Sequence, residues 1–148
     1  DRAIIAVLQQ NARLSNKELA ASVGVAPSTC SERMRRLEAE GVFTGFHATV
    51  DPGALGIGLQ AMIAVRLRRH AAEEVDAFRR HAASMPEVTS VSHVTGPNDF
   101  LVHVVVRDAD HLRDLAVSGF TTMQEVDHIE TALIFEHMAK GTLPDLTG

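Results

Sequence analysis

Three arginines, Arg33, Arg35 and Arg36, crowd one short segment and could pair with guanine edges or with phosphates. Small polar side chains just before them could reach base edges in a DNA major groove. Glu32 could accept a hydrogen bond from a cytosine amino group, although it repels phosphates. The candidate DNA-binding residues are therefore Ser28, Thr29, Ser31, Glu32, Arg33, Arg35 and Arg36. On its own, however, an arginine-rich helix is more often a solvated surface than a DNA-binding one.

The other reactive residues give little support to enzyme chemistry. Eight histidines are scattered along the chain without a His-x-x-x-His pair, so solvated or satisfied histidines are the better interpretation and we expect no metal site. Cys30 is the only cysteine, which excludes an internal disulfide and indicates a cytoplasmic setting. A Ser/His/Asp arrangement, a P-loop and a dinucleotide fingerprint are all missing from the sequence. We therefore expect no catalytic residues and no cofactor.

The three arginines lie on the last of three predicted helices. Apolar residues at helical spacing predict a helix over residues 2–11. Ser15 and Glu18 form a capping box that opens a second helix, and Gly24 supplies the turn that follows. Pro27 suits the first position of the third helix, which we expect to run to about residue 40. Three short helices with a tight glycine turn describe a helix-turn-helix unit.

The third helix has an apolar and a polar face. At 100° per residue Cys30, Met34 and Leu37 share one side, so we expect them in a core. Cys30 then fills space rather than acting as a nucleophile. The opposite face is centred on residues 28, 32 and 35 and carries the candidate DNA-binding side chains.

The segment after this helix marks a change of module. Residues 42–50 are rich in β-formers and predict one or two strands that would form a wing, and a proline and three glycines in residues 51–58 predict a linker. We expect residues 1–46 to be the DNA-binding domain, 47–58 a strand and linker, and 59–148 a second domain. The sequence begins at Asp1 without a signal-peptide pattern, so we expect no leader and some native residues before Asp1.

Hydrophobic periodicity in the second module alternates between strand and helix. The predicted strands are 61–68, 88–95, 100–106 and 126–135, and the predicted helices are 73–84 and 110–118, the latter ended by Gly119. This β-α-β-β-α-β order is the ferredoxin-like pattern, so the whole chain is predicted to be α+β. Two helices cover only one face of such a sheet. We therefore expect a second copy of the chain to cover the other face.

Composition restricts the class of protein further. The 148-residue chain is 45% hydrophobic, and its apolar runs fall short of the roughly 18 residues that a membrane span needs, so we expect no membrane association. The net charge of −5 argues weakly against a nucleic-acid partner, but the acidic excess lies after residue 50. Aromatic residues make up only 4%, which disfavours nucleic-acid binding by base stacking.

Several segments in register resemble one protein family. Residues 12–20 (ARLSNKELA), 30–41 (CSERMRRLEAEG), 42–46 (VFTGF), 86–88 (PEV) and 95–100 (TGPNDF) are similar in order and spacing to the leucine-responsive/asparagine-responsive (Lrp/AsnC) transcription regulators. The resemblance covers essentially the whole chain. It implies an N-terminal winged-type helix-turn-helix that binds double-stranded DNA, joined to a ferredoxin-like effector domain. It also implies homodimers that assemble further, commonly to octamers.

The resemblance also implies a small-molecule effector, usually an amino acid, held near the loop between the second and third strands of the effector domain. Gly96 and Asp99 in that loop match the family pattern, as does Thr131 in the last strand. Pro97 stands where an acidic residue is usual and Asn98 where an aromatic is usual, which points to an atypical ligand or to none. Asp99 either binds a ligand ammonium group or holds its own turn closed.

Two other functions compete with an effector-controlled, sequence-specific regulator. A small dimeric ferredoxin-like enzyme would not need the first 50 residues and would need an acid–base pair that we do not find. An effector-independent, DNA-architectural protein would bind DNA with little sequence preference.

Overall fold

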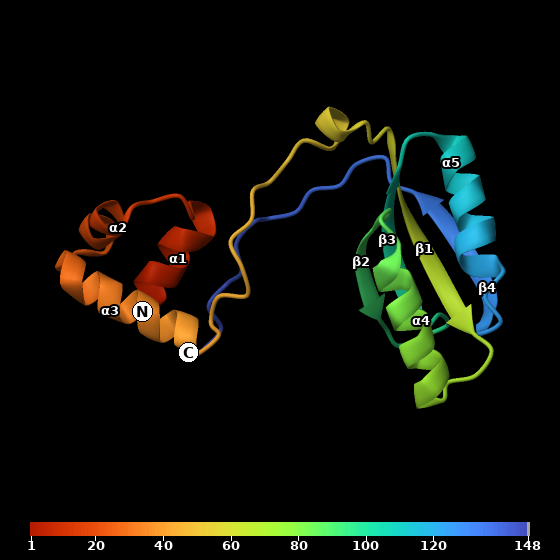
Figure 1. The fold of residues 1–148 in the computed structure, drawn as a ribbon, viewed down its shortest axis with the longest axis horizontal. Helices are drawn as coiled ribbons and strands as arrows, with labels where there is room; N and C mark the ends of the chain where they lie inside the picture. The colour runs from red at the N-terminus through yellow and green to blue at the C-terminus, as the bar shows by residue number, and fades with distance from the viewer. Residues whose placement is uncertain (148) are drawn as a thin grey trace. The chain divides into compact units, whose positions relative to one another are not determined.

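The computed structural model describes residues 1–147, and these fall into two compact units. One unit comprises Asp1–Thr49 together with the chain from Met138 onward, and the other comprises Val50–His137. The C-terminal tail thus belongs with the helical unit, whereas the sequence placed it in the second domain. Each unit is described by itself below, and we call them the DNA-binding unit and the effector unit (Figure 1).

The DNA-binding unit contains the three predicted helices: α1 (Arg2–Gln10), α2 (Asn16–Val23) and α3 (Pro27–Ala39). The capping box is confirmed, since Glu18 N–H donates to Ser15 Oγ at 3.3 Å and Ser15 N–H donates to Glu18 Oε2 at 2.8 Å. Gly24 ends α2 in the left-handed region with φ 71°, where a residue without Cβ is least strained. Local signals therefore specify both ends of α2.

The core of this unit is small. Cys30 is fully buried and Leu37 nearly so, which confirms the predicted inward face of α3, while Met34 packs against them half-buried. The buried residues of this core are Ile4, Leu8, Leu19, Ala20, Cys30 and Leu37.

The predicted strand over residues 42–50 is wrong, because this stretch is irregular throughout. A strand needs a hydrogen-bonded neighbour, and within the described residues none pairs with this segment. Phe43 packs against the helical core instead, and Phe46, 49% exposed, lies against it with ring centroids 5.4 Å apart. The linker that follows contains a short 3-10 helix, η1 (Pro52–Leu55), at a place where the sequence predicted only a linker.

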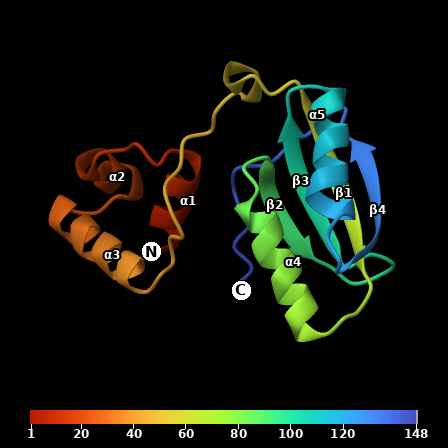
Figure 2. The ribbon, with the colours of Figure 1, turned by 45° about the vertical axis from the view of Figure 1, so that its right-hand side comes forward.

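The effector unit has the predicted βαββαβ order. Its elements are β1 (Leu59–Leu67), α4 (Ala72–Ser84), β2 (Val88–His93), β3 (Phe100–Val106), α5 (Ala109–Asp114), a π-helical segment η2 (Leu115–Thr121) and β4 (Val126–Leu133). The strand order is β2-β3-β1-β4, with every neighbouring pair antiparallel. Both helices lie against the same face of the sheet (Figure 2). The α+β class and the ferredoxin-like topology are confirmed.

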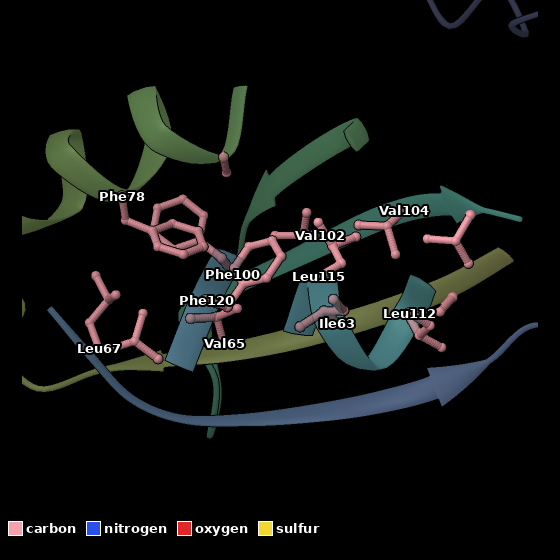
Figure 3. Close-up of a cluster of buried hydrophobic side chains, with 14 residues drawn as sticks. Ile63, Val65, Leu67, Phe78, Phe100, Val102, Val104, Leu112, Leu115 and Phe120 are labelled. Atoms are coloured by element: carbon pink, nitrogen blue, oxygen red, sulfur yellow. The ribbon is translucent and has the colours of Figure 1, made fainter. Parts of the chain in front are cut away.

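Aromatic residues fill the space between the helices and the sheet (Figure 3). Phe78 of α4 packs 4.7 Å from Phe100 of β3 and 6.1 Å from Phe120 of η2, measured between ring centroids, and all three side chains are fully buried. Alternate residues of β1, including Ile63 and Val65, point into the same core. The sheet therefore has one buried face and one face left uncovered by the helices.

Gly119 does not end the last helix, contrary to the prediction. The helix continues through it as η2 to Thr121. Gly119 is buried, a Cβ there would collide with the methyl group of Met85, and its carbonyl lies 2.6 Å from His81 Nε2. The absence of a side chain thus serves close packing against α4 rather than a turn.

Candidate DNA-binding and effector sites

Helix α3 carries the candidate DNA-binding residues. Pro27 occupies its first turn, and the carbonyl of Pro27 accepts a hydrogen bond at 2.8 Å from the side chain of Asn16. This bond joins the start of α3 to the start of α2 and so helps to fix the two helices against each other. Residues 28, 32, 35 and 36 are exposed, whereas residues 29, 31 and 33 are half-buried at the flanks.

The three arginines are not equivalent. Arg36 Nη2 lies 2.5 Å from Asp1 Oδ2, an exposed ion pair that ties the end of α3 to the start of the chain. Arg35 is exposed and makes no hydrogen bond or ion pair within residues 1–147. Sequence reasoning missed the role of Asp1, because the pair joins positions 35 residues apart. Of the two exposed arginines on α3, Arg35 is thus the one without an intramolecular partner in residues 1–147.

A hollow of about 450 Å³ adjoins this surface. Ser31 and Arg35 form one side of it, and apolar side chains including Leu14 and Phe46 form the remainder. The C-terminal half of α3 therefore lies at the edge of this hollow.

The candidate effector loop joins β2 to β3. Gly96 has φ 108°, a conformation that favours glycine, Pro97 is exposed and Asn98 is half-buried. Asp99 is only 16% exposed at its side chain, and both of its carboxylate oxygens have partners. Oδ2 accepts from the Leu67 amide at 2.7 Å, and Oδ1 lies 3.3 Å from His70 Nε2.

The contacts of Asp99 tie the loop to the sheet. Its own amide donates to the Val65 carbonyl at 2.8 Å, so residue 99 is bonded twice to the end of β1, and its carbonyl accepts from the Val94 amide across the loop at 2.9 Å. Thr131 of β4 pairs with Ile63 of the neighbouring strand β1. Strand β3, which carries the end of the loop, lies on the other side of β1. One chain therefore does not bring Thr131 and the loop together.

The uncovered face of the sheet carries both apolar and polar side chains. Its half-buried residues on the two central strands are Gln60, Met62, Ala64, Leu101, His103 and Val105. His103 lies at its centre, with Nδ1 2.8 Å from Thr89 Oγ1 and Nε2 3.0 Å from Gln60 Oε1. Burial, and after it the charge of His137, lowers the pKa of His103, and the two rings lie 5.2 Å apart. The neutral ring is therefore favoured on this face.

Comparison with known proteins identifies the family to which a chain with these two candidate sites belongs. Residues 60–144 match the family described as Lrp/AsnC ligand binding domain, and residues 1–44 match a winged helix-turn-helix DNA-binding family. The chain belongs to the Lrp/AsnC family of transcriptional regulators.

Individual relatives are similar to this chain, in sequence or in structure, over nearly its full length. The HTH-type transcriptional regulator AldR of Mycolicibacterium smegmatis is 42% identical over 97% of this chain and 84% of its own length. A transcriptional regulator of Neisseria meningitidis, solved as a complex with L-Met, superimposes with a TM-score of 0.90 at 28% identity, covering 98% of this chain and 94% of that one. Escherichia coli AsnC gives a TM-score of 0.84 at 27% identity, covering 96% and 94%.

These relatives settle the class of function. This Lrp/AsnC regulator has a helix-turn-helix for DNA and a ligand-binding domain, and it is not an enzyme, because its relatives are transcriptional regulators. In the described residues, no helix is long and apolar enough to cross a membrane. Nor do residues 1–147 contain a group of three or more His, Cys, Asp or Glu side chains that could hold a metal ion. The individual DNA-binding and effector-binding residues remain predictions.

Proposed function

We propose that this regulator binds two-fold-related DNA sites as a dimer, with α3 in the major groove, and that an amino acid or related metabolite alters that binding. The observation that carries the DNA half of the proposal is Arg35, exposed on the outer face of α3 and without a partner in the described chain. A guanidinium in this position can bond two acceptors of a guanine edge or a phosphate.

The dimer is supported by charge and by the uncovered sheet face. The whole chain has a net charge of −5, so a single copy has a weak electrostatic attraction to DNA, and a second copy doubles the phosphate contacts. The half-buried apolar residues Met62, Leu101 and Val105 give the second copy a surface to cover. The half-sites would then lie about one helical turn, or a multiple of it, apart. Light scattering checks this step, and a strict monomer at micromolar concentration would overturn it.

The effector half is supported by the ligand-binding domain itself and by the L-Met complex of the Neisseria relative. Pro97 and Asn98 depart from the usual family residues in the loop, which favours a ligand other than the family's usual one. The hydrogen bond from the Leu67 amide supports a positioning role for Asp99, which fixes the loop at the end of β1. The effector would then contact the loop backbone and the neighbouring side chains.

Substitution of Arg35 tests the DNA half directly. Arg35→Ala should weaken binding to DNA from the regulator's own upstream region by about 1–3 kcal/mol and leave the fold intact, because the side chain has no intramolecular partner in the described chain. Arg80→Ala is the matched control, since it removes the same charge from an exposed position on α4 of the effector unit.

The measurement is fluorescence anisotropy with labelled duplex, and circular dichroism verifies that both variants are folded. The control variant should bind like the wild type. Equal affinities for Arg35→Ala and Arg80→Ala would reject α3 as the DNA-contacting helix.

A further inference from the structure

The C-terminal tail makes a paired hydrogen-bond contact with α1 inside the DNA-binding unit. The Leu143 amide donates to Gln9 Oε1 at 2.6 Å, and Gln9 Nε2 donates to the Leu143 carbonyl at 3.3 Å. The Gln9 carboxamide thus supplies the donor and the acceptor that a neighbouring β-strand residue would supply. This pairing recognises an extended backbone rather than a particular side chain.

A second contact fixes the direction of the tail. Asp145 Oδ2 lies 3.2 Å from Arg2 Nε, and Asp145 Oδ1 accepts from the amide and hydroxyl of Thr147. Hydrogen bonds from Thr147, with a smaller contribution from Arg2, lower the pKa of Asp145 and keep it charged. Arg2 and Gln9 are two helical turns apart on one side of α1, and residues 143 and 145 share one side of an extended segment. The tail therefore runs antiparallel to α1.

The tail and the helical unit enclose a hollow between them. Its volume is about 840 Å³, and its walls are α1, the irregular stretch 42–49 and the tail itself. Leu143 and Leu146 remain 80% and 86% exposed, so polar contacts rather than apolar burial hold the segment. A segment held in this way can be released without loss of either hydrophobic core.

The course of the chain gives this contact a consequence. The boundary between the units is crossed once at Thr49–Val50 and again at His137–Met138. His137 is in ring contact with His103 in the effector unit, and Leu143 is held by Gln9 in the DNA-binding unit, so only residues 138–142 lie between two fixed points. When the tail is bound to α1, the DNA-binding unit is attached through two chain segments instead of one.

We propose that residues 138–147 are a strap, which Gln9 and Arg2 of α1 hold, and that its binding restricts the freedom of the DNA-binding unit. The strap contact itself does not depend on the proposed function, but its effect on DNA does. A strap that limits the freedom of two DNA-binding units raises their effective concentration at paired half-sites, so its release weakens binding to a two-half-site duplex.

Tryptic cleavage after Lys140, an exposed residue within the strap, reports release without DNA or effector. In the full-length protein, Gln9→Ala should speed this cleavage about three- to tenfold, the factor expected for the loss of about one net hydrogen bond. Gln10→Ala is the matched control, because this exposed neighbour on α1 makes no hydrogen bond to the tail in the described chain. Mass spectrometry identifies the cleaved bond, and thermal melts verify that the helices are intact.

Asp145→Ala is a second variant that leaves α1 unaltered, and it should also speed cleavage after Lys140. Faster cleavage in both variants, with Gln10→Ala like the wild type, supports the strap. Equal cleavage rates in wild type, Gln9→Ala and Asp145→Ala would overturn it. Either result stands whether or not the protein binds DNA.

Discussion

The two units of this regulator are stabilised in different ways. Among the described residues, six form the buried core of the DNA-binding unit and fourteen form that of the effector unit. The smaller core is accompanied by local devices: a capping box, a left-handed glycine and a proline in the first turn of α3. The larger core is built from strands paired across long stretches of sequence.

This difference indicates where stability resides and where change is tolerated. Burial of apolar surface is the dominant favourable term in folding, so the effector unit should be the more stable of the two. A domain of about 60 residues buries a smaller share of its surface and is marginal. The DNA-binding unit should therefore open first, and small contacts such as caps should matter more to it.

The largest effect on stability is expected from a substitution in the core of the effector unit. Phe78→Ala removes a fully buried ring that contacts Phe100 and Phe120, and it should cost about 3–5 kcal/mol of unfolding free energy. Urea denaturation measures this loss. Val117→Ala, at a position 55% exposed on η2, should have little effect. If both variants unfold like the wild type, the aromatic cluster is not the main source of stability in this unit.

A smaller effect should arise from the cap of α2. Ser15→Ala removes the acceptor for the Glu18 amide and should destabilise the DNA-binding unit by about 0.5–2 kcal/mol. The Ser15 hydroxyl and amide both donate to the Glu18 carboxylate and lower its pKa, so loss of the hydroxyl should move that pKa part of the way back toward its usual value. Ser22→Ala is the control, because Ser22 is an exposed serine of the same helix whose hydroxyl bonds only the Glu18 carbonyl. Hydrogen exchange of α2 amides checks the comparison, and equal exchange in both variants would contradict it.

The smallest effect concerns pH and belongs to the effector unit. Because burial and His137 lower the pKa of His103, the unfolded chain, which titrates near 6.5, binds that proton more readily than the folded one. The stabilisation from neutral His103 is fully present above about pH 6.5 and is lost as pH falls below it toward the lowered pKa. His103→Gln should therefore lose less stability than the wild type between about pH 7.5 and about pH 5.5.

Urea denaturation at the two pH values measures this difference. The glutamine side chain of the His103→Gln variant retains a donor and an acceptor for Thr89 and Gln60, and it loses the ring contact with His137 together with the titration. An identical loss of stability in wild type and variant would show that His103 does not contribute.

Local chemistry made much of the fold predictable. The capping box at Ser15, the turn at Gly24 and the inward face of α3 at Cys30 depend on neighbours within a few residues, and the structure has all three. The βαββαβ order followed from periodicity alone. Recognition of the candidate effector loop, by contrast, needed the resemblance, because nothing in the chemistry of residues 96–98 selects a ligand.

Features that depend on distant partners were not predictable. The stretch 42–50 has strand-forming composition, but among residues 1–147 no strand pairs with it. Gly119 resembles a helix stop in the sequence, but its lack of a side chain is explained by the close approach of Met85. The Gln9–Leu143 pair joins residues 134 positions apart, and no local pattern announces it. These are the places where tertiary contacts override local preference.

Effector-dependent DNA binding is the central claim, and one titration tests it most directly. Thermal shift first selects, from the twenty amino acids, the one that most stabilises the full-length protein. Anisotropy titration of the regulator's own upstream duplex then gives the affinity with and without that amino acid. We predict that the two dissociation constants differ at least about fivefold, the lower end of typical coupling between sites. Tight DNA binding that no amino acid alters would contradict the account and identify an effector-independent, DNA-architectural protein instead.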